Sequence, residues 1–134
     1  MFINNIRTIT VFFAFVCALA GCRQTVDVHF DPSVADYTPV VREILENHPE
    51  GNITLRFGKG VYPFYPEKAP EEFLNVSNND SGNKRVAFLL KNMKNVRIAG
   101  DETDFMFHGS MTPFAVKGSE NVEISGISID YDYP

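Results

Sequence analysis

The chain contains two closely similar stretches of sequence, and this internal repeat constrains its fold more than any other feature. The stretch "FLLKNMKNVRIAG" occupies residues 88–100, and "FAVKGSENVEISG" occupies residues 114–126, so equivalent positions are 114 − 88 = 26 residues apart. The identical pairs are Phe88/Phe114, Lys91/Lys117, Asn95/Asn121, Val96/Val122, Ile98/Ile124 and Gly100/Gly126. Repetition at a fixed spacing of this size is typical of stacked structural units that meet equivalent surroundings.

The repeated positions suit strands that stack on one another. The two apolar positions of each copy alternate at period two, as inward-facing residues of a strand do. The preceding asparagine stands where Asn tolerates the left-handed backbone of a turn, and stacked Asn side chains can form a hydrogen-bonded ladder. "NITLRFG" at residues 52–58 is a fainter third copy. We therefore predict that four repeated residues point inward and pair across neighbouring strands at about 4.8 Å, Val96 with Val122 and Ile98 with Ile124.

One helix precedes a series of short strands. Thr38 is a plausible N-cap with Pro39 at the first helical position, apolar residues from Val40 to Leu45 fall on one face, and Pro49 and Gly51 end the helix. The strands expected beyond it are "ITLRF", "VYPFY", "VAFLL", "VRIA", "DFMFH", "FAVK", "VEIS" and "ISIDY". In a sandwich of hairpins, successive strands would have no reason to share a sequence. The pattern predicts an all-β fold, a right-handed parallel β-helix (solenoid) whose first coil is covered by the helix.

The first 21 residues have the pattern of an export signal. Arg7 precedes an uninterrupted apolar run from Val11 to Ala20, which suits a signal-peptide core but is shorter than the about 20 residues that span a bilayer. The run ends in "LAGC", which resembles a bacterial lipobox with Cys22 as the lipidated residue. The alternative is an ordinary secretory signal. The sequence predicts a lipoprotein signal peptide (1–21), a tether (22–34) and an incomplete β-helix (35–134), held in the bacterial cell envelope by a lipid anchor on Cys22.

The charge balance and the histidine spacing argue against nucleic-acid and metal binding. Without Arg7, the segment 22–134 has 11 basic and 17 acidic residues, a net charge of 11 − 17 = −6. This balance, without a basic stripe, argues against nucleic acid as a partner. His29 and His48 show no ligand spacing with another histidine or acid, so we predict no metal site and no cofactor.

Three residues are candidates for chemistry. Asp130 and Asp132 are two positions apart on one strand, about 6.5 to 7 Å by strand rise, which overlaps the lower edge of the carboxylate separation in inverting glycosidases, about 6.5 to 9.5 Å. The alternative is that they mark the turn out of the strand. His108 follows two aromatic residues and precedes a glycine, which makes it a candidate for a substrate groove, although a lone histidine more often only ends a turn.

A family resemblance covers residues 35–134. "EGNITLRFGKGVYPFYPE" resembles the first coil of the pectate-lyase-like superfamily, and "FHGSMTPF" with "ISIDYDYP" resembles the opening coils of glycoside hydrolase family 110. That resemblance implies an exo-acting, inverting bacterial α-1,3-galactosidase that removes terminal galactose from glycans. The family's catalytic carboxylates lie in later coils, so none is carried over to this chain. A β-helical lyase or polygalacturonase, or a noncatalytic glycan-binding lipoprotein, remains the alternative.

Overall fold

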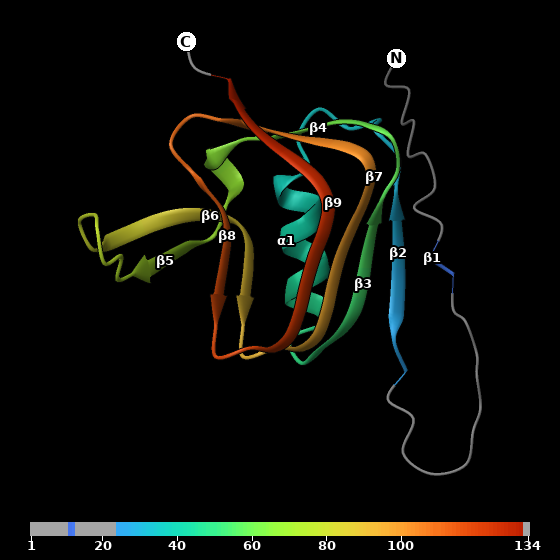
Figure 1. Cartoon of the computed structure of the whole chain (residues 1–134), viewed down its shortest axis with the longest axis horizontal. Coiled ribbons are helices and arrows are strands. Elements are labelled where there is room, and N and C mark those ends of the chain that lie inside the picture. Colours follow the sequence, from blue (N-terminus) through green and yellow to red (C-terminus); the bar gives the residue numbers. More distant parts are fainter. Residues whose placement is uncertain (1–10, 13–23, 133–134) are drawn as a thin grey trace, which may run out of the picture.

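The computed structural model describes residues 11–12 and 24–132. Strands dominate and there is one α-helix among these residues, which confirms the all-β class (Figure 1). The elements are β1 (Val11–Phe12), β2 (Val26–Phe30), α1 (Thr38–Asn47), β3 (Gly51–Phe57), β4 (Gly60–Phe64), the 3-10 helix η1 (Pro66–Lys68), β5 (Glu71–Leu74), β6 (Gly82–Lys91), β7 (Lys94–His108), β8 (Thr112–Lys117) and β9 (Glu120–Asp132). No helix within the described ranges is long and apolar enough to cross a membrane.

Successive copies of the repeat pair in parallel. β2, β3, β7 and β9 lie side by side in that order, and β4 also pairs with β7 (Figure 1). β6 and β8 form a second parallel pair across the interior. Val96 pairs with Val122 and Ile98 pairs with Ile124, which confirms the predicted register. From β6 to β9 the chain alternates between the two sheets, so β8 pairs with β6 and β9 pairs with β7.

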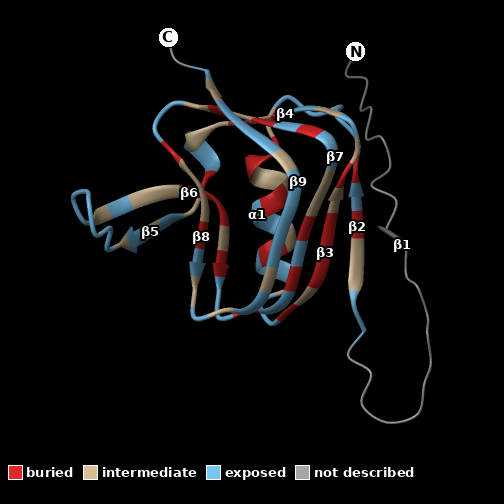
Figure 2. Cartoon of the chain, in the orientation of Figure 1, coloured by how far each residue is buried: buried red, intermediate tan, exposed pale blue. Residues whose placement is uncertain are grey.

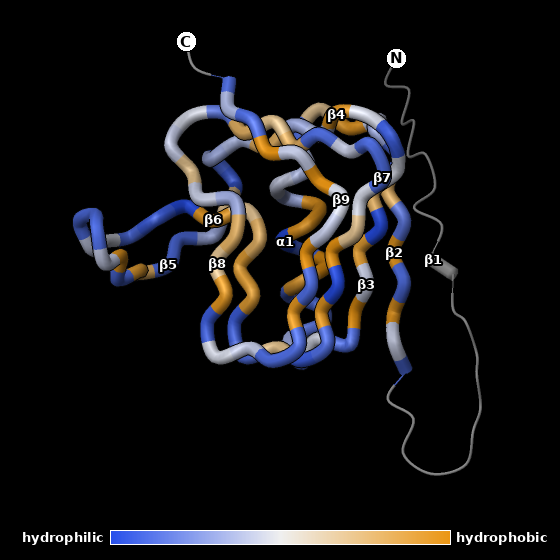
Figure 3. Tube along the Cα trace, in the orientation of Figure 1, coloured by the Kyte–Doolittle hydropathy of each residue, from blue (hydrophilic) through white to orange (hydrophobic). Residues whose placement is uncertain are grey.

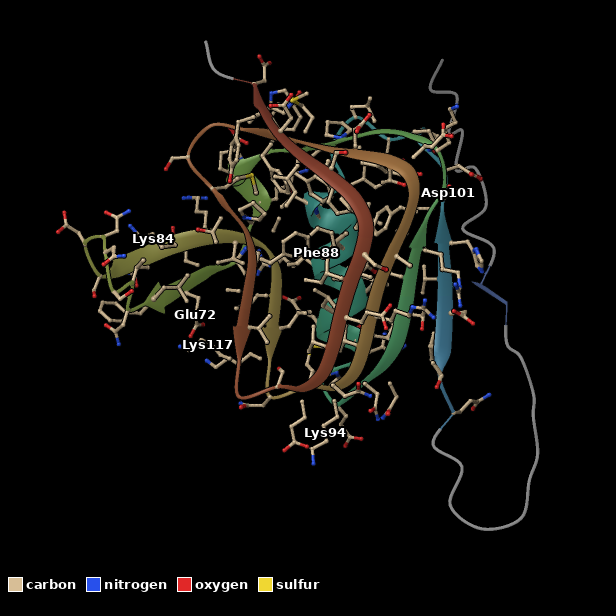
Figure 4. All side chains as sticks on the ribbon, viewed as in Figure 1. Glu72, Lys84, Phe88, Lys94, Asp101 and Lys117 are labelled. Carbon is tan, nitrogen blue, oxygen red and sulfur yellow. The ribbon has the colours of Figure 1, made fainter. Side chains whose placement is uncertain are left out.

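The inward side chains form one core. Buried residues alternate with more exposed ones along much of β7, whereas β3 is buried at most positions (Figure 2), and apolar residues alternate with polar ones in both strands (Figure 3). Phe88 lies in the interior (Figure 4) and stacks on Phe105 and Phe114, with ring centroids 5.4 and 4.9 Å away. Val96 and Ile98 are buried as predicted.

Ile124 lies on the inward side as predicted, but it is not enclosed. It pairs with buried Ile98 and therefore lies on the inward side of its strand, yet it is 39% exposed. Val122 beside it is only partly buried. The reason is positional, because β9 pairs with β7 along one edge and no other described strand covers its second edge.

An asparagine ladder lies at the second residue of β3, β7 and β9, where each strand turns into its straight part. Asn52, Asn95 and Asn121 have φ values of 54°, 56° and 54°, the left-handed region that Asn tolerates better than most residues. The Nδ2 of Asn95 donates to the Oδ1 of Asn52 at 2.9 Å, and the Nδ2 of Asn121 donates to the Oδ1 of Asn95 at 2.8 Å. The predicted turn conformation and ladder are both confirmed, and the faint third copy at residues 52–58 belongs to the same stack.

The helix α1 packs against the second sheet. It buries Val41 and Leu45 and contacts β6. Thr38 is not its N-cap, as the sequence suggested, but its first residue. The carboxylate of Asp36 accepts the Thr38 N–H at 2.9 Å instead, and the Thr38 hydroxyl accepts the N–H of Tyr65 at 3.0 Å. The threonine therefore ties the helix to the end of β4.

The interval between β3 and β7 is longer than the repeat. Val96 follows its partner Ile53 by 96 − 53 = 43 residues, against 26 between Val96 and Val122. The additional residues include the antiparallel β5–β6 hairpin, which projects from the body (Figure 1). A second irregularity lies between Ala99 and Thr103 of β7, where the strand register against β9 shifts.

The carboxylate of Glu72 joins this hairpin to β6 and β8. Lys91 and Lys117 are neighbours in the parallel pair of β6 and β8, and both reach Glu72 of β5, at 3.3 and 2.6 Å. Figure 4 shows Glu72 beside Lys117. The Glu72 side chain is only 14% exposed. The hydrogen bond from Lys117, followed by that from Lys91, lowers the pKa of Glu72 below its ordinary value of 4.5.

We expect Ile98→Ala to lower the free energy of unfolding by about 2 to 5 kcal/mol, because it opens a cavity in an enclosed core. Ile124→Ala is the matched control, since the same side chain is removed from the exposed end of the same row. Urea denaturation followed by circular dichroism measures both. Equal losses in the two variants would contradict the packing described above.

Glu72→Gln should destabilise the protein in a pH-dependent manner. Because the folded-state pKa of Glu72 is lowered, its stabilising contribution is complete above the ordinary value of 4.5 and is lost as the pH falls through the lower folded-state value. We therefore expect the stability gap between the original protein and the variant to be present at pH 7 and to close in acid. Denaturation midpoints across this range measure it, with Glu71→Gln on the same strand as control.

Candidate functional site

The candidate site lies on the solvent side of β4, β7 and β9. The inward residues of these strands are buried aromatic side chains such as Tyr62, Phe105 and Phe107, so the alternate positions face outward. These positions form three rows that run across the strands: Val61, Asp104 and Ser128; Pro63, Met106 and Asp130; Tyr65, His108 and Asp132. We call these nine residues the outer face.

The third row brings two predicted residues together. The ring of His108 stacks on Tyr65 with centroids 4.2 Å apart and planes 2° apart. Its Nδ1 lies 3.3 Å from the Oδ2 of Asp132, which is the partner of His108 in the register of β7 and β9. The His108 side chain is 21% exposed, whereas that of Asp132 is 64% exposed. His108 is therefore held between an aromatic ring and a carboxylate, with an edge open to water.

Tyr65 was missed by sequence reasoning. It lies one position after β4, and His108 is the last residue of β7, whose preceding residue Phe107 pairs with Phe64. The signal was present, because "VYPFY" and "DFMFH" are equivalent strands that both end in a ring. Aligning these two segments, as well as the more obvious repeat, would have identified the stacked pair.

Asp130 and Asp132 both belong to β9. The strand spans Glu120–Asp132, so Asp130 lies within it and Asp132 is its last residue. Tyr131 between them faces inward and packs against Phe107, with centroids 5.7 Å apart, which places the two carboxylates on the same outward side. The Oδ1 of Asp130 accepts the N–H of Tyr131 at 2.8 Å. Both aspartates are exposed, whereas the general acid of a glycosidase is typically held in a desolvated pocket.

Two other polar features lie near these strands. A shallow hollow at the bend of β7 and β9 is lined in part by Lys59, Glu102 and Asp104, and Lys59 forms an ion pair with Glu102. On the inward side, burial raises the pKa of Tyr62 to about 12, and its hydroxyl donates toward the carbonyl oxygens of Phe30 and Gly58. Within residues 24–132, no three His, Cys, Asp or Glu side chains gather in a group that could hold a metal.

Cys22 lies outside the described residues, as does the predicted signal peptide apart from Val11–Phe12. The segment predicted as a tether, residues 22–34, contains β2. This strand extends the sheet beyond β3, and Val28 and Phe30 are buried in the core. The segment was predicted to be a tether because its composition is polar, but every second residue of β2 is apolar and faces the core.

Comparisons with known proteins identify relatives of one kind. No protein-family model matches the chain. α-1,3-Galactosidase A of Shewanella woodyi is 38% identical over 102 residues, which cover 74% of this chain and 16% of that protein. α-1,3-Galactosidase B of Parabacteroides distasonis is 35% identical over 115 residues, 85% of this chain and 18% of that protein. An α-1,3-galactosidase B of Phocaeicola vulgatus is 40% identical over 83 residues, which cover 61% of this chain and 14% of that protein. The chain thus spans less than a fifth of these relatives.

Proposed function

Because the chain belongs to glycoside hydrolase family 110, the α-1,3-galactosidases, we propose that it forms part of an enzyme that acts on glycans with terminal α-linked galactose. The single observation that carries this proposal is the identity of 35% across 85% of the chain with a protein of that name. In this reading the reaction is exo-acting and inverting. One carboxylic acid protonates the leaving oxygen, and a second carboxylate activates water on the opposite face of the sugar.

The chain supplies the first coils of a right-handed parallel β-helix in this proposal, with α1 as its cap. The parallel register of β3, β7 and β9 and the alternation of strands between two sheets support it. Three inward-side residues at the far end of the stack, Val116, Ile124 and Ile129, are 39% to 49% exposed. Further coils of a longer protein would bury them, and the catalytic acids belong to such coils rather than to these.

Two alternatives from other classes remain testable. A β-helical lyase or polygalacturonase would act on acidic polysaccharides and would use Ca²⁺ or a catalytic Arg. A noncatalytic lipoprotein would bind glycan without cleaving it. The similarity to proteins named α-1,3-galactosidase favours the first proposal over both.

We expect the purified chain to release no galactose from an α-1,3-linked substrate, and we expect a full-length relative to release it. Inverting hydrolysis needs two carboxyl groups across a shaped pocket, one of them desolvated, and Asp130 and Asp132 are both exposed. Released galactose is measured by a coupled dehydrogenase assay. Release above background that is lost in both Asp130→Asn and Asp132→Asn would make that pair the active site and overturn this expectation.

We further propose that the protein lies in the bacterial cell envelope, anchored through lipid on Cys22. The support is the short apolar run from Val11 to Ala20 and the "LAGC" motif. A single acyl chain anchors only weakly, so several chains on one cysteine would be needed for stable attachment.

Cys22→Ser should leave an unlipidated and uncleaved precursor. Metabolic labelling with a clickable fatty acid, together with the gel mobility of the product, measures both properties. Cys17→Ser is the matched control, because Cys17 lies inside the signal core and should have no effect on labelling. If the Cys22 variant is labelled and processed like the original, the lipobox interpretation is wrong.

A further inference from the structure

We propose that a very short linker holds the folded body against the surface of a lipid bilayer, with the end at which β2, β3, β7 and β9 begin facing the lipid. The inference rests on the proposed lipid anchor at Cys22 and adds the orientation of the body relative to the membrane. Two observations carry it: the position at which the chain enters the sheet, and the parallel pairing that brings the beginnings of four strands together.

The linker between Cys22 and the sheet is much shorter than the tether that the sequence predicted. β2 begins at Val26, four positions after Cys22, and Val28 and Phe30 of this strand are buried in the core. An extended chain spans at most about 3.6 Å per residue, so the Cα atom of Val26 lies within about 14 Å of that of Cys22. The polar headgroup layer of one bilayer leaflet is about 5 to 8 Å thick. The linker therefore crosses this layer with little length to spare.

The linker enters the body at the end where the strands begin. Parallel pairing places the beginnings of β2, β3, β7 and β9 at this one end (Figure 1). Val26 pairs with Ile53, so the chain enters the sheet level with the first residues of β3. The polar residues that begin β3, β7 and β9 form what we call the strand-start surface: Asn52, Lys94, Asn95, Glu120 and Asn121.

The strand-start surface suits the headgroup layer rather than the hydrocarbon core. Its asparagine side chains form the ladder, and the Nζ of Lys94 lies 3.4 Å from the Oε2 of Glu120. The large apolar residues that are exposed in the described part of the chain all lie elsewhere. One basic and one acidic side chain leave the surface without net charge, so anionic lipids do not attract it. Attachment therefore depends on the acyl chains, and the linker sets the orientation.

The open edge of β2 is the competing contact with the bilayer, because the proposed cleavage before Cys22 removes β1. An open strand edge carries backbone N–H and C=O groups that need water or another strand as partner. The amides of the strand-start surface are already bonded to one another. Contact through the strand-start surface therefore removes fewer unpaired polar groups from water.

This orientation keeps the third row of the outer face away from the lipid. β7 begins at Lys94 and ends at His108, on the opposite side of the body (Figure 1). The seven residues of β3 alone span about 20 Å, more than twice the Debye length of about 8 Å at physiological salt. The third row thus lies beyond the reach of the membrane's surface charge. Further coils added beside β9 would extend along the membrane plane.

The test uses the lipidated chain, purified from bacterial membranes and reconstituted into vesicles that contain a nickel-chelating lipid. Cys17 and Cys22 are the only cysteines of the sequence, so a single introduced cysteine can carry a nitroxide label on the processed, lipidated chain. Lys94→Cys places the label on the strand-start surface. Asp101→Cys is the matched control, because it places the label on the same strand at the other end (Figure 4). The nickel ions speed the relaxation of nearby nitroxides.

We expect the relaxation enhancement at position 94 to exceed that at position 101 by at least about threefold, because the dipolar effect falls steeply with distance and the two positions are about 20 Å apart along the strand. Insertion of about twenty Gly and Ser residues directly after Cys22 should remove most of this difference, since a flexible linker of that length spans about 25 Å. Sedimentation with the vesicles should be unchanged by the insertion. Circular dichroism confirms that each variant is folded.

The outcomes separate the orientation from the anchor. Equal enhancement at the two positions, or a larger one at position 101, overturns the orientation and leaves the anchor intact. A difference that survives the insertion also overturns it, because the short linker would then not orient the body. Residues 22–134 with Cys22→Ser, made without the signal segment, should not sediment with the vesicles. Sedimentation as strong as that of the lipidated chain contradicts the dependence on lipid and with it the proposal, whereas the galactose-release assay on a full-length relative is independent of all these results.

Discussion

The in-register parallel pairing of β3, β7 and β9 is the constraint on which the rest of the structure depends. It places identical or similar residues one above another, so the same side of each strand becomes core and the other becomes surface. Asn95 bonds to the asparagine before it and the one after it, which fixes the turn at the beginning of each strand. A change of register by one residue would reverse both the core and the outer face.

Much of this fold could be predicted from sequence because the repeat is local and its spacing is regular. The alternating Val96 and Ile98 indicated the inward side, and the recurrent asparagine indicated the left-handed turn. The strand β2 was missed because its inward positions, Val28 and Phe30, are interrupted by Asp27 and His29 and read as a polar segment. The exposure of Ile124 could not be predicted, since burial depends on what pairs with the second edge of β9.

The candidate site was only partly predictable. Asp132 and His108 were identified separately, from a close acid pair and from an aromatic context. Their contact depends on a register between β7 and β9 that changes at the bend. The stack of His108 on Tyr65 joins residues that are 108 − 65 = 43 positions apart, across an interval that does not follow the repeat. Sequence reasoning therefore identified His108 and Asp132, but neither Tyr65 nor the contacts that join the three residues.

The unequal intervals of the stack indicate where the chain tolerates changes of length. Val122 follows Val96 by 122 − 96 = 26 residues, whereas Ile129 follows Phe105 by 129 − 105 = 24, and the bend of β7 absorbs the difference. Insertions or deletions in the projecting β5–β6 hairpin would leave the rows aligned, whereas the bend is closely packed: a Cβ on Gly126 would lie 2.1 Å from the Gly100 carbonyl oxygen, and the buried Thr103 hydroxyl donates to the Phe57 carbonyl oxygen. One residue inserted between Asn95 and Ile98 would turn a core position toward water. Changes of chain length are therefore expected in the β5–β6 hairpin and not within the paired strands, so the outer face keeps its geometry.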